Sequence, residues 1–248
     1  MGKVRIQRVA MMGGAVLLGV YVLWGSWAFK ANKGKGEICE GVEVVVQDNV
    51  QEQFLTSADV VAIMKSEEVY PVGKTWKEID TEKLEKTVER HDMVAQAEAF
   101  LTLSGKVKVV VTQREPVLRV MGMYGNFYVD RSGKIMPVSV RSTAYLPVAC
   151  GYVEKEMAIG SLYEIALFLR NDAFWNVQIE QLYVRRDREV EFIPRVGDHR
   201  IVLGPPDGFE KKLENLRLFY EQAIPKLGWQ KYSVINLKYR GQVVCTRR

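Results

Sequence analysis

The chain has 248 residues, a formal net charge of +5 and 48% hydrophobic side chains. Residues 1–36 and 229–248 hold eleven basic residues and no acid, which leaves 24 basic against 30 acidic residues in between. The central body is therefore mildly acidic. This argues against a nucleic-acid-binding protein, which needs positive charge spread over a binding face.

Near the N-terminus, residues 9–29 carry no charge. At about 1.5 Å per residue they form about 31 Å of helix, enough to cross a hydrocarbon core of about 30 Å. Aromatic side chains, which prefer the headgroup level, gather toward one end of this stretch at Tyr21, Trp24 and Trp27. We expect an uncleaved anchor after a cytoplasmic tail of residues 1–8. A cleaved signal peptide is the alternative, but its apolar region is usually shorter.

Lysines follow the span as well as precede it, so the flanking charge leaves the orientation open. We place the body outside the cytoplasm because large domains are translocated with little regard to charge. Residues 30–40 lack apolar periodicity and contain glycines at their centre, which is typical of a tether.

The next segment, residues 41–115, has the pattern of a small β-α-α-β-β domain. The β-branched run 41–47 predicts a strand, Thr56 predicts the cap of a helix over 56–65, and Asp80 opens a second helix. Two apolar-alternating runs, 95–103 and 106–120, surround a Ser-Gly pair and predict a hairpin.

After Pro116 the chain changes to short strands with turns, and residues 116–248 are predicted to form a second α+β domain on an antiparallel sheet. The expected strands are residues 126–129, 134–138, 146–148, 177–185, 189–194, 199–203, 233–239 and 242–246. Amphipathic helices are expected over residues 161–171 and 209–227.

Groups for catalysis are not assembled in any recognisable motif. His91 and His199 have no partner at ligand spacing, so both are expected to be solvent-exposed, and we predict no catalytic residue, no metal site, no cofactor and no small-molecule substrate. Cys39, Cys150 and Cys245 match no zinc or redox spacing. Buried or juxtamembrane thiols are the favoured interpretation of the cysteines, with a disulfide as the alternative.

A protein without catalytic groups acts through its surfaces, and the chain end is the candidate surface. A terminal strand over 242–246 often lies at a sheet edge, where its unpaired N–H and C=O groups accept a partner strand. The basic residues beside it would attract an acidic partner. A strand edge merely protected from aggregation by charge remains the alternative.

Short motifs in the first domain resemble those of the FtsQ/DivIB family of bacterial cell-division proteins. The segment from Phe54 to Val60 resembles the opening of that family's first POTRA helix, and Trp76 with Asp80 resembles the start of the second. Val94 and the run from Val109 to Val117 resemble the family's "V-x-x-A… V-x-x-R-x-P-V/I-A" stretch.

The second domain continues the resemblance in the same order. Its fragments are YVDRSG at Tyr128, LPV at Leu146 with Gly151, IVLG at Ile201 and NLKY at Asn236 followed by Gly241. Across nearly the whole chain, the arrangement resembles that of the FtsQ/DivIB family, whose members have a short tail, one membrane span, a POTRA domain and a β domain.

This resemblance implies a non-enzymatic scaffold at the division septum of the inner membrane, which helps to regulate septal peptidoglycan synthesis. The implied partners are coiled-coil division proteins of the FtsB and FtsL families. The partner-binding residues implied by position are Lys238, Tyr239, Arg240, Gly241, Gln242, Val243 and Val244. A recruitment face on the POTRA domain is implied around Val94, Gln113, Arg114 and Pro116.

Two other functions compete with this one. A POTRA-bearing envelope protein of assembly or transport would need tandem repeats or a C-terminal barrel. A membrane-anchored envelope enzyme would need a nucleophile with its base, or a metal cluster.

Overall fold

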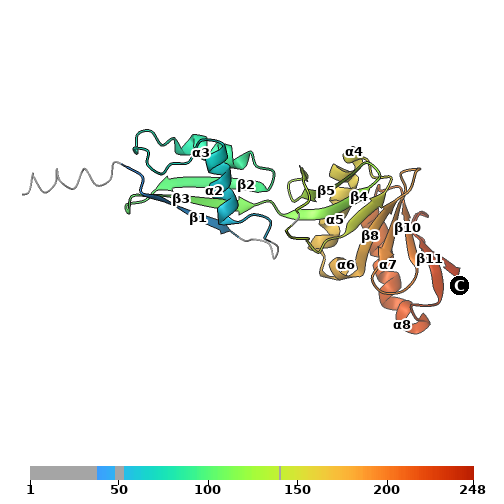
Figure 1. The fold of residues 1–248 in the computed structure, drawn as a ribbon. Helices are drawn as coiled ribbons and strands as arrows, with labels where there is room; N and C mark the ends of the chain where they lie inside the picture. The colour runs from blue at the N-terminus through green and yellow to red at the C-terminus, as the bar shows by residue number, and fades with distance from the viewer. Residues whose placement is uncertain (1–37, 48–52, 140) are drawn as a thin grey trace, which may run out of the picture. The chain divides into compact units, whose positions relative to one another are not determined.

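A computed structural model describes residues 38–47, 53–139 and 141–248, which form two compact units (Figure 1). The predicted tail (1–8) and anchor (9–29), and most of the tether (30–40), lie outside the described residues. Among the residues described, no helix combines the length and apolarity needed to cross a membrane.

The first unit is a three-stranded sheet with two helices, in the predicted order β-α-α-β-β. Its elements are β1 (Gly41–Gln47), α2 (Ser57–Ser66), α3 (Thr81–Glu89), β2 (Val94–Leu101) and β3 (Lys106–Gln113). The strands lie in the order β1-β3-β2, so β3, the last of the three in sequence, is the central strand of the sheet.

Both helices begin where the sequence places a capping side chain. Thr56 and Asp59 form a reciprocal capping box at α2, and the Asp80 side chain accepts a hydrogen bond from the N–H of Lys83 at α3. The predicted helix starts are therefore confirmed. Leu84 and Val88 of α3 are buried, as their four-residue spacing predicted.

The predicted hairpin is confirmed, but its second run is two strands rather than one. β3 ends at Gln113, and β4 (Pro116–Gly122) belongs to the larger sheet. The prediction of a single run over 106–120 is therefore wrong. Pro116 has no backbone N–H, and the residue before a proline is restricted, so the chain readily leaves the first ladder here.

The second unit contains a sheet of nine strands in the order β12-β11-β10-β9-β8-β7-β4-β5-β6. Its other strands are β5 (Gly125–Asp130), β6 (Ile135–Met136), β7 (Val148–Gly151), β8 (Ile179–Val184), β9 (Val190–Pro194), β10 (Arg200–Gly204), β11 (Tyr232–Asn236) and β12 (Val244–Arg247). Its helices are α4 (Lys155–Ile159), α5 (Ser161–Asn171), α6 (Ala173–Gln178), α7 (Phe209–Gln222) and α8 (Ile224–Leu227).

This sheet is mixed, which corrects the prediction of an antiparallel one. The pairs β4–β7, β7–β8 and β10–β11 are parallel. Parallel neighbours need a connection that returns the chain to the same end of the sheet, and helices supply it twice. Helices α4 to α6 connect β7 to β8, and α7 with α8 connects β10 to β11.

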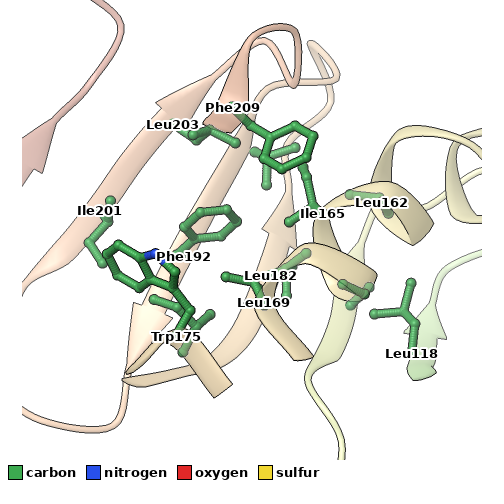
Figure 2. Packing of buried hydrophobic residues seen from close by; sticks show 14 of the residues in the cluster. Leu118, Leu162, Ile165, Leu169, Trp175, Leu182, Phe192, Ile201, Leu203 and Phe209 are labelled. Carbon is green, nitrogen blue, oxygen red and sulfur yellow. The ribbon is translucent and has the colours of Figure 1, made fainter. Parts of the chain in front are cut away.

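One face of the large sheet forms the main core. Buried side chains from α5, α6 and α7 meet side chains of the strands, and Figure 2 shows Trp175, Leu169 and Ile165 beside Phe192 and Leu182. Helix α5 has the predicted bounds, and its buried face confirms the predicted stripe.

Two helix boundaries in this unit differ from the predictions. Residues 177–178 belong to α6 rather than to a strand, because the Asp172 side chain caps a short helix by accepting from the N–H groups of Phe174 and Trp175. The predicted helix over 209–227 is divided at Ala223 into α7 and α8, and Pro225 follows directly.

Candidate functional site: the C-terminal sheet edge

The chain end forms a hairpin whose turn is built from local hydrogen bonds. The Asn236 side chain accepts from the N–H of Lys238 at 3.0 Å, and the N–H of Gln242 donates to the carbonyl of Tyr239 at 3.1 Å. Gly241 has a φ of 70°, a left-handed conformation that glycine adopts without strain. The turn therefore directs the chain back along β11 as β12.

β12 lies at the end of the nine-strand order, so among the described residues only its β11 side is paired. The partly buried side chains of Val243 and Cys245 pack against the core, whereas 43% of Val244 is exposed. Alternate residues of an edge strand direct their N–H and C=O groups away from the sheet. β12 therefore presents an open ladder.

The structure shifts the predicted edge strand by two residues at its start. Tyr239, Arg240 and Gly241 lie in the turn, and Gln242 and Val243 precede β12. Val244 is the first residue of the strand. The predicted strand over 242–246 and the earlier one over 233–239 are both corrected, because the Asn236 turn ends β11 before Leu237.

Basic side chains surround this edge, and some of them already have acidic partners. Lys238 forms an ion pair with Glu189, and Arg248 contacts the Asp198 carboxylate at 3.2 Å. Arg240 and Arg247 are exposed and have no ion-pair partner among the described residues. These two guanidinium groups are therefore available to an acidic partner.

The sheet face opposite the helices continues from this edge. In the strand register Tyr183, Glu191, Val202, Asn236 and Val244 are aligned from β8 to β12. Their neighbours in sequence face the helices, and side chains alternate along a strand, so this row lies on the uncovered face.

An open groove of about 760 Å³ lies on this face, beside the edge. It is lined by Tyr152, Tyr183, Arg185, Arg186, Asp187, Glu189, Glu191, Arg200, Val202, Asn236 and Lys238. Glu191 is 6% exposed and lies between Arg185 and Arg200, with N–O distances of 3.7 and 3.1 Å. Arg186 stacks on the ring of Tyr152 and has no carboxylate partner among the described residues.

Sequence reasoning missed this groove. The available signal was Glu189 and Glu191, which alternate with the apolar Val190 and Phe192 and so indicate a polar face on this strand. Alignment of this strand with its neighbours depends on tertiary register, and the sequence does not reveal it.

The predicted recruitment face of the first domain is not an exposed surface. Val94, Gln113 and Pro116 are buried, and the Arg114 side chain is 11% exposed. The Gln113 side-chain oxygen accepts hydrogen bonds from the N–H groups of Phe54 and Leu55 at 2.8 and 2.7 Å. We therefore correct this prediction, because these side chains hold the chain together instead of facing solvent.

Arg114 forms a buried ion pair with Asp130, with 2.6 Å between Nε and Oδ2. The other Asp130 oxygen accepts from the N–H and hydroxyl of Ser132 and from the N–H of Lys134. Burial raises the pKa of Asp130, but these hydrogen bonds and the Arg114 charge outweigh it, so the pKa is lowered. Arg114, from the motif that ends the first domain, thus forms an ion pair with Asp130 of the next motif.

His199 is buried, at 3% exposure, which corrects the prediction that it is solvent-exposed. Its Nε2 lies 2.6 Å from the Tyr220 hydroxyl, and its ring stacks on Trp229. Burial and the Arg248 charge lower the pKa of His199, against an opposite effect of Asp198. A buried histidine that stacks on Trp229 and meets the Tyr220 ring edge-on is a core group of this unit.

The cysteines are free, with Cys39 buried and the other two partly buried. Within the described ranges of the chain, no cluster of three or more His, Cys, Asp or Glu side chains is placed to hold a metal ion.

Comparison with known families identifies both units. Residues 115–246, more than half of the chain, match the family described as FtsQ/DivIB, C-terminal related. Residues 37–112 match the POTRA-like domain. No curated protein matches the chain.

Proposed function

Because this chain belongs to the FtsQ/DivIB family, we propose that it is a non-enzymatic scaffold of the bacterial cell-division machinery. In this proposal residues 9–29 anchor it in the inner membrane at the septum. The body lies on the periplasmic side, binds FtsB/FtsL-like coiled-coil proteins and helps to regulate septal peptidoglycan synthesis.

The observation that carries the proposal is the open ladder of β12 beside unpaired basic side chains. A partner strand would add to β12 through backbone hydrogen bonds, which bind an extended segment of almost any sequence. Arg240 and Arg247 would favour a partner with acidic side chains in matching positions. Lys238 contributes less than the sequence suggested, since Glu189 already neutralises it.

The groove extends the same interface beyond the edge. Asn236 and Lys238 line the groove and also belong to the hairpin that carries β12. A partner that leaves the edge at Val244 would pass over Tyr183 and Arg186, residue types that often dominate binding energy at interfaces.

Membrane anchoring would make a modest affinity sufficient. Two proteins that each cross the same bilayer are confined near its surface, which raises the effective concentration of one edge for the other.

The first test is a charge-reversal experiment on the full chain in lipid nanodiscs. Its probe is a peptide from the periplasmic segment of an FtsB-like protein of the same cell. The double variant Arg240→Glu with Arg247→Glu should weaken peptide binding by about tenfold or more, at roughly 1 kcal/mol per charge. The control Lys226→Glu reverses one exposed charge on α8, away from the edge, and should bind like the wild type. Equal affinities for all three proteins would reject this binding mode.

The second test examines the ladder itself. Along β12, N–H groups point alternately toward β11 and away from the sheet, so Val244→Pro and Cys245→Pro remove one of each. We expect the variant that loses an N–H facing β11 to unfold at a lower temperature. The variant that loses an N–H facing away from the sheet should keep its stability but lose binding. Wild-type affinity in the variant that keeps its stability would exclude strand addition.

A further inference from the structure

The first unit exposes apolar side chains at one of its ends. The exposed fractions are 54% for Ile38, 37% for Val72, 42% for Leu101 and 110% for Leu103. None of these four belongs to the buried core of the unit. Exposed apolar side chains that gather at one place mark interaction sites, whereas single ones are ordinary. We call these four residues the apolar tip.

Backbone hydrogen bonds bring the parts of the apolar tip together. The N–H of Glu40 donates to the carbonyl of Gly105 at 2.8 Å, which fixes the β2–β3 turn beside the start of the unit. On the other side, the N–H of Cys39 donates to the carbonyl of Lys74 at 2.9 Å. Figure 1 shows the β2–β3 turn and the loop before α3 at the same end of this unit as the start of β1.

The turn that carries Leu103 is closed by backbone hydrogen bonds. The N–H of Thr102 donates to the carbonyl of Lys106 at 2.8 Å, and Gly105 adopts a left-handed φ of 80°. Leu103 is therefore held outward at the end of a short hairpin, without a contact that covers it within the described residues.

The chain that precedes the tip limits its distance from the proposed anchor. Ile38 follows residue 29, the end of the uncharged stretch, by nine residues. Nine residues span at most about 30 Å when extended, and about 16 Å on average as a flexible chain. Ile38 is thus the described residue nearest in sequence to the proposed anchor, and the apolar tip to which it belongs is within reach of the membrane surface.

Two lysines beside the tip can reach a lipid surface. Lys74 and Lys106 form no ion pair among the described residues, while Glu40 lies next to the β2–β3 turn and Glu68 and Glu78 lie near Lys74. Lysine ammonium groups favour anionic headgroups, while leucine side chains enter the boundary between headgroups and acyl chains.

We propose that the apolar tip docks on the outer surface of the membrane that anchors the chain, with Leu103 inserted among the lipids. This inference rests on the proposed function, because it needs the anchor to bring the tip to the bilayer. Its consequence is that the first unit is held against the membrane at the end from which the span emerges.

The test uses the full chain in liposomes with Cys150 and Cys245 replaced by serine, while the fully buried Cys39 is retained. An environment-sensitive fluorophore is attached at Leu103→Cys, and nitroxide-labelled lipid is the quencher. Leu218→Cys is the matched control, since Leu218 is an exposed leucine (47%) in the second unit. We expect at least twofold stronger quenching at position 103 than at position 218.

Equal, weak quenching at the two positions overturns the docking. A blue-shifted probe at position 103 that lipid nitroxide does not quench also overturns it, because a protein contact then covers the leucine. A third probe at Ser26→Cys reports the anchor separately. Quenching at position 26 without quenching at position 103 rejects the apolar tip and leaves the anchor standing, whereas absence of quenching at position 26 rejects the anchor.

Discussion

Replacing Asp130 with asparagine should destabilise the second unit strongly, although the side chain keeps its size. The carboxylate is 6% exposed and pairs with Arg114, whose own side chain is 11% exposed. Arg114 also donates to the carbonyls of Asp92 and Ile135 at 2.9 and 3.1 Å, so its position is fixed on several sides. The asparagine leaves this guanidinium without a charge partner.

The size of the effect follows from these contacts. Removing one partner of a buried ion pair costs about 3–5 kcal/mol, because the remaining charge is neither paired nor hydrated. Asparagine keeps an oxygen that accepts from the N–H groups of Ser132 and Lys134. We therefore expect a loss of folding free energy at the lower end of this range, about 3 kcal/mol. For a unit of this size that corresponds to a fall in melting temperature of roughly 6–12 °C.

The effect should also depend on pH. The pKa of Asp130 is lowered in the folded protein, so its carboxylate stabilises the fold above the unfolded pKa of about 4. This stabilisation is lost as the pH falls through the folded pKa, where the wild type becomes protonated as well. The difference between wild type and Asp130→Asn should therefore be largest at neutral pH and narrow below about pH 4.

The assay is thermal unfolding of the full chain in detergent, followed by far-UV circular dichroism between pH 7 and pH 3. Asp187→Asn is the matched control, because Asp187 pairs with Arg185 at the surface, where both side chains are about half exposed. That change should cost less than about 1 kcal/mol. An equal melting temperature for the two variants, or a difference that does not narrow in acid, would refute the reasoning.

Three further changes probe other parts of the fold. Gln113→Ala leaves two buried backbone N–H groups without their acceptor, so unfolding in urea should need about 2–4 kcal/mol less free energy. Burial and the Arg248 charge lower the pKa of His199, so acidification below about pH 6.5 should destabilise the wild type, and His199→Phe should flatten this part of the pH–stability curve. Gly151→Ala should reduce soluble yield and melting temperature, because at φ 88° its Cβ would lie 2.3 Å from the carbonyl oxygen of Val184.

Local signals in the sequence were sufficient for much of the fold. Thr56 and Asp80 are capping residues whose hydrogen bonds lie within one helical turn, so the two helix starts follow from the chain alone. The alternation of Val107, Val109 and Val111 likewise predicts the buried face of β3. Such features need no knowledge of distant residues.

Features that depend on distant residues were not predictable in the same way. The parallel pairs of the second sheet follow from where the helices return the chain, and no local pattern encodes that choice. His199 has a polar sequence context, yet Tyr220 and Trp229 come from α7 and the segment after α8 to enclose it. Isolated polar residues of this kind are interpreted correctly only when their tertiary partners are known.

In the candidate site, too, the residues that stand in sequence motifs differ from the residues that the structure leaves available for binding. This difference affects how a binding experiment is interpreted. Gln113, Arg114 and Asp130 stand in motifs that suggested the family, and all three are framework residues with several internal hydrogen bonds. Arg240 and Arg247 are exposed and without an acidic partner in the described chain, although neither stands out in a motif.

A loss of partner binding after mutation therefore has two different physical causes. Changes at Arg114 would act by destabilising the fold, and a loss of binding would be accompanied by a lower melting temperature. Changes at Arg240 would act on the interface and leave the melting temperature unchanged, since an exposed charge without a partner contributes little to folding. Measuring stability and affinity on the same variants thus separates the framework from the binding surface. If Arg240→Glu lowered the melting temperature as far as Asp130→Asn does, the assignment of the C-terminal edge as a binding surface would lose its physical basis.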